Sequence, residues 1–312
     1  MARYLVTGGA GFIGGYIARA LERAGHTITV VDDLSSGLER NIPEGATFVR
    51  GDLRDDATIA ALPSSVDAVL HLAAQPSAEI SHDDPLRDFD VNARGTLRLL
   101  QWAEHQGITR FLHASSMAVY GATDGIARED TPLRPGSFYG AGKVAAEAYV
   151  SLFARRGMRT TSFRMFNVYG SGQDLANMRQ GMASIYMAFL LRGEPVVVKG
   201  SLDRFRDLVH VSDVADAWIR SIDDSRADGK IYNVGTGRKS TVADMLDALG
   251  RAFGYGKGQC PATVVAGTAG DIHGNVADIS AIRGDLGWEP ATTLEAGIAE
   301  MAAWAKAETG KA

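Results

Sequence analysis

The side chains best suited to acid–base chemistry in this chain are a tyrosine and a lysine four positions apart, Tyr139 and Lys143. If they begin a helix, as the pattern from residue 138 predicts, their i and i+4 side chains lie on one face. A phenol acts as a base near neutral pH only where its phenolate is stabilised, and a neighbouring ammonium does this. The spacing alone is a frequent chance match, whose plain alternative is a surface tyrosine beside a solvated lysine. Ser115-Ser116, at the end of a predicted strand, favours chemistry because a serine can hydrogen-bond the reacting oxygen and relay its proton.

A glycine-rich turn, TGGAGFIG at 7–14, lies where a first predicted strand passes into a first predicted helix. Glycine is needed there because the backbone angles are unusual and the main chain must approach a pyrophosphate closely. The helix start then offers free N–H groups to that anion. Asp32, at the end of the second strand, would hold the adenosine ribose hydroxyls and repel a 2′-phosphate. The pattern predicts a dinucleotide site that prefers NAD to NADP. Because Asp33 is the next residue, the sequence leaves open whether Asp32 or Asp33 is a solvated turn residue.

Two further strand ends carry residues that could line the same site. Gly51-Asp52-Leu53 follows the third strand, where the carboxylate could accept from the adenine amino group or serve as a helix-start acid. The small residues of His71-Leu72-Ala73-Ala74 end the fourth strand and would let the backbone pass beneath the cofactor. His71 itself is interpreted as a core histidine or as one that supports the site from behind.

Short β-branched runs alternate with helical patterns through the first half of the chain. The candidate strands are Arg3–Thr7, Thr27–Asp32, Thr47–Arg50, Ala68–Leu72, Arg110–Ser115 and Thr160–Phe166. The candidate helices are Phe12–Ala24, Thr58–Ala61, Pro85–Gln106 and Phe138–Arg156. Apolar runs of this length are typical of strands buried on both faces of a parallel sheet. Their strict alternation with helices predicts a doubly wound α/β fold.

After Phe166 the alternation is lost, and a Gly/Gln/Asn-rich stretch at 170–181 predicts a loop. Asp207–Val211 and Lys230–Val234 are expected to be strands that return to the sheet. The other candidate elements are a helix ending near Arg192, a strand Pro195–Val198, and helices near Val242–Phe253, Asp278–Leu286 and Leu294–Ala307. We expect a Rossmann domain over 1–167, with returning segments near 207–236, and a smaller, discontinuous mixed α/β substrate domain over 168–312. The active site would lie in the cleft between them.

Composition excludes several classes of protein. The 312 residues are 46% hydrophobic and 22% charged, as in an ordinary globular protein. A net charge of −5 argues against nucleic acid as the main partner. Cys260 is the only cysteine, so an intramolecular disulfide or a cysteine-based metal site is impossible, and we expect no metal. Because no run is long enough to cross a bilayer and no signal peptide opens the chain, no membrane association and a cytoplasmic location are expected.

Taken together, the motifs resemble the extended short-chain dehydrogenase/reductase family, and within it nucleotide-sugar 4-epimerases such as the UDP-glucose 4-epimerases. The resemblance covers nearly the whole chain. It is carried by TGGAGFIG (7–14), VVDDLSSG (30–37), GDLRD (51–55), HLAAQ (71–75), DVNARGT (90–96), SSMAVYG (115–121), SFYGAGK (137–143), RMFNVYG (164–170), RDLVHVSDVADA (206–217) and GDIHGNVAD (270–278). It implies that Tyr139 takes the proton from the sugar 4-hydroxyl while a hydride passes from C4 to NAD. A 4-keto intermediate would then turn over and receive the hydride on its other face.

The resemblance also implies partners and roles for individual residues. A UDP-sugar is the expected substrate, and a homodimer formed through Pro85–Gln106 and Phe138–Arg156 is the expected assembly. The expected catalytic residues are Tyr139, Lys143 and Ser116. The expected NAD-binding residues are Gly8, Gly11, Phe12, Ile13, Gly14, Asp32, Ser36, Gly37, Asp52, Leu53, Leu72, Ala73, Ala74, Asn92, Ser115, Tyr139 and Lys143. The expected substrate-binding residues are Ser116, Tyr139, Asn167, Lys199, Arg204, Arg206, Asp271 and Asn275, with Asn167 and Arg206 on the diphosphate.

Met117 directly follows the expected catalytic serine, at a position where the related dehydratases and decarboxylases carry an acid. Those enzymes must move protons at further sugar positions. An aprotic side chain there favours epimerisation, which needs only one acid/base and a reversible hydride transfer.

Three substrate-side positions depart from the UDP-sugar pattern. Lys199 stands where an aromatic residue usually packs near the base, Thr268 where an arginine normally grips the diphosphate, and Asn275 where a residue gates the size of the C2 substituent. Loss of the arginine matters most, because a charged phosphate contact contributes about 2–3 kcal/mol. Lys199 or Arg204 could restore the charge, although Arg204 can equally be interpreted as a solvated side chain. Asn275, of modest size, predicts tolerance of an N-acetyl group.

Two other classes of function use the same fold. A net oxidoreductase would employ the same residues but release NADH. A non-catalytic, NAD-binding regulatory protein would usually have lost Tyr139, Lys143 or Ser116, and all three are present.

Overall fold

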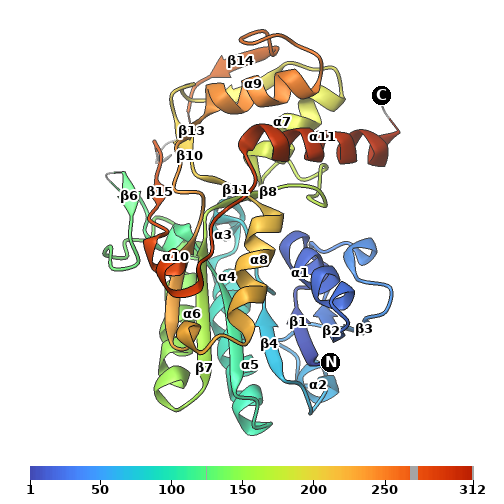
Figure 1. Ribbon diagram of the computed structural model, residues 1–312, viewed down its shortest axis with the longest axis vertical. Helices are drawn as coiled ribbons and strands as arrows, with labels where there is room; N and C mark the ends of the chain where they lie inside the picture. Colours follow the sequence, from blue (N-terminus) through green and yellow to red (C-terminus); the bar gives the residue numbers. More distant parts are fainter. Residues whose placement is uncertain (124, 268–272, 311–312) are drawn as a thin grey trace.

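The computed structural model describes residues 1–123, 125–267 and 273–310. Its larger lobe is built on a seven-stranded parallel sheet in the order β12-β7-β5-β4-β1-β2-β3 (Figure 1). The strands are β1 (Arg3–Thr7), β2 (Thr27–Asp32), β3 (Thr47–Arg50), β4 (Ala68–His71), β5 (Arg110–Ser116), β7 (Arg159–Met165) and β12 (Lys230–Val234). The strand order reverses between β1 and β4, which opens a crevice at their carboxyl ends. The predicted doubly wound α/β fold is confirmed.

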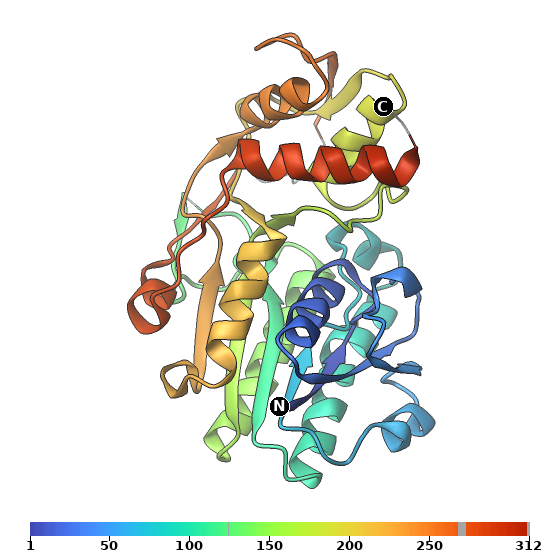
Figure 2. The same ribbon diagram turned by 45° about the vertical axis from the view of Figure 1, so that its right-hand side comes forward.

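Helices cover both faces of this sheet (Figures 1 and 2). The helices of this lobe are α1 (Phe12–Arg23), α2 (Asp56–Ala61), α3 (Ala78–Asp83), α4 (Pro85–Phe89), α5 (Gly95–His105), α6 (Phe138–Arg155), α8 (Val211–Ile222) and α10 (Ser280–Leu286). α1 packs against α8 on one face, and α5 packs against α6 on the other. Successive side chains of β1 point to opposite faces of the sheet. Tyr4 and Val6 therefore join the core under α1, and Leu5 joins the core under α5.

The predicted helix Pro85–Gln106 is helical but not uniform. Residues Asp90–Arg94 form a π-helical turn between α4 and α5. Such a turn inserts an extra residue and re-aims the side chains that follow, and π-helical turns are frequent at functional sites. Asn92 lies inside this turn and is buried. The short helix α3 just before this segment was not anticipated from the sequence.

The segment around residue 210 corrects one expectation and adds a helix that was not predicted. Of the two strands expected to return to the sheet, Lys230–Val234 does so as β12, but Leu208–His210 (β11) pairs instead with Asn167–Tyr169 (β8) in a separate two-stranded sheet. The prediction for Asp207–Val211 was therefore wrong about its partner. The helix α8 that starts at Val211 was missed, although Val211, Val214 and Trp218 are spaced along one helical face and are all buried. The β-branched run just before it obscured the change of period.

A smaller lobe lies beyond the carboxyl edge of the sheet, at the top of Figure 1. Its helices α7, α9 and α11 enclose a separate apolar core that includes Tyr186, Met245 and Met301. Its elements are α7 (Met182–Leu191), β9 (Val196–Lys199), α9 (Val242–Ala252), β14 (Ala262–Val265) and α11 (Leu294–Thr309). β9 pairs with β14.

Two short strand pairs and three short helical turns complete the described elements. They are β10 (Phe205–Arg206) with β13 (Ser240–Thr241), β15 (Val276–Ala277) with β6 (Ile126–Ala127), and the turns η1 (Glu39–Asn41), η3 (Met117–Val119) and η4 (Ser225–Ala227). The expected domain boundary at 167/168 falls within β8 and stays a prediction. None of the helices in the described part of the chain is long and apolar enough to cross a bilayer.

Candidate active site

A cleft of about 520 Å³ opens at the carboxyl ends of the sheet strands and extends toward α7 of the smaller lobe. All but one of the expected NAD-binding residues line it, as do three of the expected substrate-binding residues. The lining residues from these two sets are Gly8, Gly11, Phe12, Ile13, Gly14, Asp32, Ser36, Gly37, Asp52, Leu53, Leu72, Ala73, Ala74, Ser115, Ser116, Tyr139, Lys143 and Asn167. Side chains from seven separate stretches of sequence thus meet in one crevice, as the strand order requires.

The turn after β1 is shaped for close approach of another molecule. Gly8 has a φ of +71°, and a Cβ there would lie 2.6 Å from the backbone nitrogen of Ala73. Any larger residue would therefore push the two strand ends apart. Gly11 is the N-cap of α1 and no side chain caps this helix, so its first turn presents N–H groups toward the cleft. These features fit the pyrophosphate of a dinucleotide.

Asp32 is the buried member of the acidic pair after β2. Its Oδ2 accepts from the backbone N–H of Ala10 at 3.0 Å and its Oδ1 from that of Leu34 at 2.9 Å. Burial raises the pKa of this carboxyl, and the two backbone hydrogen bonds oppose the rise. Asp33 is exposed and accepts from Ser35, as a turn residue does. The geometry therefore favours Asp32 as the ribose acceptor that disfavours a 2′-phosphate.

Asp52 has a partner that sequence reasoning missed. Arg54 donates to both of its carboxylate oxygens, from Nε at 2.9 Å and from Nη2 at 2.6 Å to Oδ2, and from Nε at 3.1 Å to Oδ1. The hydrogen bonds from Arg54 hold the pKa of Asp52 below its usual range. Both side chains line the cleft, so an adenine at this end would meet an ion pair and not a lone carboxylate.

The acid–base group is assembled from the end of β5 and the first turns of α6. Ser137 caps α6 by accepting from Gly140 N–H at 3.1 Å, which fixes the helix start beside Ser116. The Nζ of Lys143 lies 5.9 Å from the centre of the Tyr139 ring and donates to the carbonyl of Ala114 at 2.8 Å. Although Lys143 is only 3% exposed, it lines the cleft together with Tyr139 and Ser116.

Burial sets the protonation of this group in the protein alone. It raises the pKa of Tyr139 to about 12, with a hydrogen bond to Ser116 opposing the rise and the charge of Asp88 adding to it. Burial lowers the pKa of Lys143 to about 8, and the carboxylates of Asp88 and Glu147 oppose this fall. At neutral pH the phenol is therefore protonated beside a lysine that is mostly charged. Additional positive charge in the cleft, such as that of an oxidised nicotinamide ring, would be needed to favour the phenolate.

Asn92 and His71 lie behind the wall of the cleft. Asn92 accepts from Gln75 N–H at 3.0 Å and donates from Nδ2 to the Gln75 carbonyl at 3.1 Å, so it fixes the loop after β4. His71 is buried between the hydroxyls of Thr7 and Thr96, at 2.7 and 2.9 Å. These contacts are those of a core histidine, which is one of the two interpretations that the sequence allowed.

Asn167 and Met117 meet on the substrate side of the cleft. The Nδ2 of Asn167 donates to the Asp207 carbonyl at 3.2 Å and to the Met117 sulfur at 3.4 Å. Both residues line the cleft, so the position after Ser116 presents a thioether to whatever is bound there. A thioether neither gives nor takes a proton.

Of the remaining expected substrate residues, the four that the structure describes, Lys199, Arg204, Arg206 and Asn275, do not line the cleft. Arg206 donates to the carbonyls of Phe205 and His273 at 2.8 and 3.3 Å, and burial lowers its pKa with the charge of Arg204 adding to the effect. Lys199 is exposed at the end of β9. Asn275 is fully buried, with no hydrogen-bond partner for its side chain among the described residues. Asp271 and Thr268 lie outside the described residues. The roles of this set stay predictions.

Glu147 on α6 and Arg164 on β7 form a buried ion pair that sequence reasoning missed. Arg164 donates from Nε and Nη2 to the two carboxylate oxygens of Glu147, at 2.9 and 2.7 Å. Ser115 also donates to Glu147. The periodicity held a signal for it, because Glu147 follows Lys143 by four residues and Tyr139 by eight and thus shares their helix face.

Similarity to known proteins agrees with this geometry. Residues 4–235 match the NAD dependent epimerase/dehydratase family. A UDP-glucose 4-epimerase of Mycolicibacterium smegmatis is 34% identical, with 96% of each chain covered. A dTDP-glucose 4,6-dehydratase of an Actinoplanes strain is 33% identical, with 98% of each chain covered. The crystal structure of a Thermotoga maritima UDP-glucose 4-epimerase with UDP-glucose matches with a TM-score of 0.92 at 32% identity, covering 98% of this chain and 99% of that one.

The family match spans more than half of the chain and includes the glycine turn, Ser116, Tyr139 and Lys143. The expected resemblance and the expected cofactor, NAD, are confirmed. This chain is an NAD-dependent enzyme of the epimerase/dehydratase family.

Proposed function

We propose that this enzyme is a 4-epimerase of a nucleotide diphosphate sugar, with a UDP-hexose such as UDP-glucose as its substrate. The observation that carries the proposal is the convergence of Ser116, Tyr139 and Lys143 on one cleft in which Met117 is the adjoining side chain. Ser116, Tyr139 and Lys143 together supply one reversible acid/base. Met117 cannot supply a second one.

The chain's own groups account for the proton transfers. When bound, NAD supplies a hydride acceptor and, later, a hydride donor at C4 of the sugar. Tyr139 takes the proton of the 4-hydroxyl as the ketone forms, with Ser116 hydrogen-bonded to the same oxygen. The charge of Lys143 stabilises the phenolate that must exist before this step. After the 4-keto sugar has turned its other face to the cofactor, Tyr139 returns the proton and the enzyme regains its starting state.

Met117 separates this function from that of the dehydratase relative. Elimination of water from a 4-keto sugar needs a base for a neighbouring carbon and an acid for the leaving hydroxyl. A thioether can be neither, and Asn167, which contacts the Met117 sulfur, is also non-titrating. We therefore expect the ketone to be reduced again and not dehydrated.

The test is incubation of the purified enzyme with UDP-, dTDP-, GDP- and CDP-hexoses, followed by NMR identification of the products. Epimers at C4 without net NADH formation are expected, fastest with a UDP-sugar. A 4-keto-6-deoxy product would assign the enzyme to the dehydratases. Stoichiometric NADH release would make it a net dehydrogenase.

Tyr139→Phe is the variant that addresses the acid/base. It should abolish epimerisation while NAD stays bound, because only the ionisable hydroxyl is lost. Tyr149→Phe removes a hydroxyl from the same helix outside the cleft and should leave the rate unchanged. Full activity of Tyr139→Phe would contradict the proposed mechanism.

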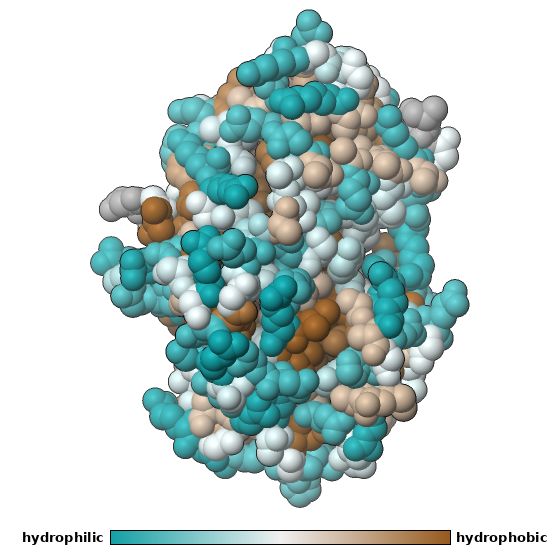
Figure 3. Space-filling model, in the orientation of Figure 1, coloured by the Kyte–Doolittle hydropathy of each residue, from teal (hydrophilic) through white to brown (hydrophobic). Residues whose placement is uncertain are grey.

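A homodimer and a cytoplasmic location belong to the same proposal. Leu86 and Phe89 on α4 and Phe138 and Leu152 on α6 are large apolar side chains with 46–78% of their surface exposed, and α4 packs against α6. The face seen in Figure 3 is mostly hydrophilic or neutral, with an apolar patch near its middle. Apolar surface gathered on neighbouring helices supports a two-fold interface there. Light scattering coupled to size-exclusion chromatography should give twice the chain mass of 33.2 kDa.

A further inference from the structure

Lys143 is the cation on which the proposed acid–base chemistry depends, and it is buried. A buried ammonium tends to lose its proton unless an opposite charge compensates it. The groups that act on it come from each neighbouring element. Asp88 on α4 and Glu147 on α6 favour its charged form. His71 on β4 and His113 on β5 are buried and have strongly lowered pKa values, so both are neutral.

Of the two carboxylates, Glu147 is already compensated. Arg164 donates to both of its oxygens at 2.7 and 2.9 Å, and Ser115 adds a further hydrogen bond. Glu147 and Arg164 are both 4% exposed at their side chains, so the pair is buried as a neutral unit. Its net field at Lys143 is therefore that of a dipole and not of a free anion.

Asp88, unlike Glu147, has no arginine among its described neighbours that balances its charge. It is 1% exposed, and only its Oδ1 is used, accepting from Gln75 Nε2 at 2.8 Å and from Asn92 Nδ2 at 3.0 Å. Its Oδ2 is buried and has no hydrogen-bond partner among the described residues. Within the same described part of the chain, Asp88 forms no ion pair at contact distance. A buried carboxylate with an unused oxygen is costly unless a nearby charge balances it.

The unused oxygen points at the catalytic helix. A Cβ added to Gly142, the residue before Lys143, would lie 3.0 Å from Asp88 Oδ2 and 3.2 Å from Asn92 Cβ. Glycine at this position lets the π-helical turn and α6 approach closely. The carboxylate consequently sits against α6 at the residue that precedes Lys143.

We propose that Asp88 is the counter-ion of Lys143, a positioning residue that keeps the ammonium charged while Tyr139 gives and takes its proton. The inference rests on the proposed function for its role in turnover, but the pairing itself does not. Asp88 touches neither the substrate nor the cofactor, because it is absent from the lining of the cleft. It acts through Lys143 and, by its charge, on Tyr139.

Asp88→Asn is the sharpest variant, because an asparagine can keep the Oδ1 acceptor for Gln75 and Asn92 and only removes the charge. Without that charge the pKa values of both Lys143 and Tyr139 fall, since Asp88 raises each of them. Both limbs of the kcat–pH profile should therefore move toward lower pH, by about one unit or more. Limbs that stay in place, with kcat lowered at every pH or unchanged, would overturn the proposal.

Two companion variants keep the result interpretable. Asp90→Asn removes the same charge two residues away, at a partly exposed side chain that pairs with Arg94, and should not move the profile. Gly142→Ala would push Asp88 away from α6 and should move both limbs in the same direction by less. A Gly142→Ala profile identical to that of the wild type would count against the proposal even if Asp88→Asn failed to fold.

A measurement without turnover separates this proposal from the proposed function. In heteronuclear NMR titrations of isotopically labelled lysine side chains, the signal lost in Lys143→Met belongs to Lys143. It should titrate at lower pH in Asp88→Asn than in the wild type, whether or not the protein epimerises any sugar. The same titration midpoint in both proteins would refute the pairing.

Discussion

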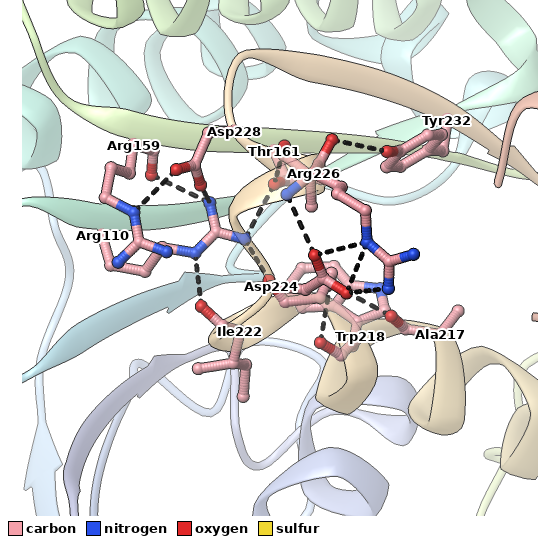
Figure 4. Close-up of polar contacts among 12 residues, drawn as sticks. Arg110, Arg159, Thr161, Ala217, Trp218, Ile222, Asp224, Arg226, Asp228 and Tyr232 are labelled. Carbon is pink, nitrogen blue, oxygen red and sulfur yellow. Dashed lines mark hydrogen bonds and ion pairs between the residues drawn. The ribbon is translucent and has the colours of Figure 1, made fainter. Parts of the chain in front are cut away.

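Two buried cations contact the same strand, β5, and they differ in how completely the fold satisfies them. Arg110 begins the strand and is 2% exposed. It donates from Nε to the Ile222 carbonyl at 2.8 Å, from Nη1 to the Arg159 carbonyl at 3.0 Å, and from Nη2 to Thr161 and the Ser221 carbonyl (Figure 4). Lys143 reaches the other end of the strand and, within the described residues, makes one hydrogen bond, to Ala114.

This difference in hydrogen bonding separates a cation that stabilises the fold, Arg110, from one that serves the active site, Lys143. Arg110 donates hydrogen bonds to the last carbonyls of α8 and pairs with Asp228 at 3.5 Å. Its donors are therefore used by the protein itself. Burial lowers its pKa to about 10, which still leaves it charged at neutral pH. The ammonium of Lys143 has three N–H groups and keeps donors free beside the cleft. A buried cation whose hydrogen-bond donors are not all used is costly for folding. Lys143 is such a cation, and it lies where a bound ligand can accept from the remaining donors.

The largest expected effect is on turnover, from Lys143→Met. Loss of the ammonium beside Tyr139 should lower kcat by about 10²- to 10⁴-fold, the usual range for general acid–base groups. The melting temperature should fall much less than in a variant of Arg110, because the loss of a counter-charge for Asp88 is offset when the desolvation cost of the buried ammonium is also removed. Steady-state kinetics and calorimetry on the same preparation test both halves. A large loss of stability would break the contrast with Arg110.

Arg110→Met should do the reverse. Removing the guanidinium leaves several carbonyls without their donor, so the free energy of unfolding should fall by about 3–5 kcal/mol. The folded fraction should keep its kcat, since the residue is remote from the cleft. Arg156→Met breaks an exposed pair with Glu104 and should cost less than about 1 kcal/mol in the same denaturation experiment. An equal loss of unfolding free energy in Arg110→Met and Arg156→Met would show that burial does not decide how much an arginine stabilises the fold.

A pH dependence of stability is also expected. The pKa of Lys143 is lowered in the folded protein to about 8 from its ordinary value of 10.5, so between these values the unfolded chain binds more protons than the folded one. Stability contributed by this residue therefore rises with pH across that window. The free energy of unfolding of the wild type should increase relative to that of Lys143→Met from about pH 8 upward. A constant difference between the two proteins would mean that Lys143 is not perturbed by burial.

Much of the site could be predicted because its parts are local in sequence. The glycine turn, Asp32 at the end of β2 and the i, i+4 pair on α6 each follow from backbone sterics or helix periodicity over a few residues. The doubly wound parallel sheet followed from the β/α alternation, but its strand order came from the structure. By contrast, the sequence did not indicate that Asp52 faces Arg54, or that residues 90–94 form a π-helical turn.

The amino-acid sequence by itself thus determined which chemistry this protein can perform: a dinucleotide turn, a tyrosine with its lysine, and an aprotic Met117 beside the serine. Only the tertiary structure decided which charges surround that lysine and which cations serve the fold. Asp88 and Lys143 are 55 positions apart, and Arg110 and the end of α8 are farther still. Such pairings depend on how helices pack across a sheet. No local pattern encodes them, because the contact energies that select them exist only once the chain has closed those loops.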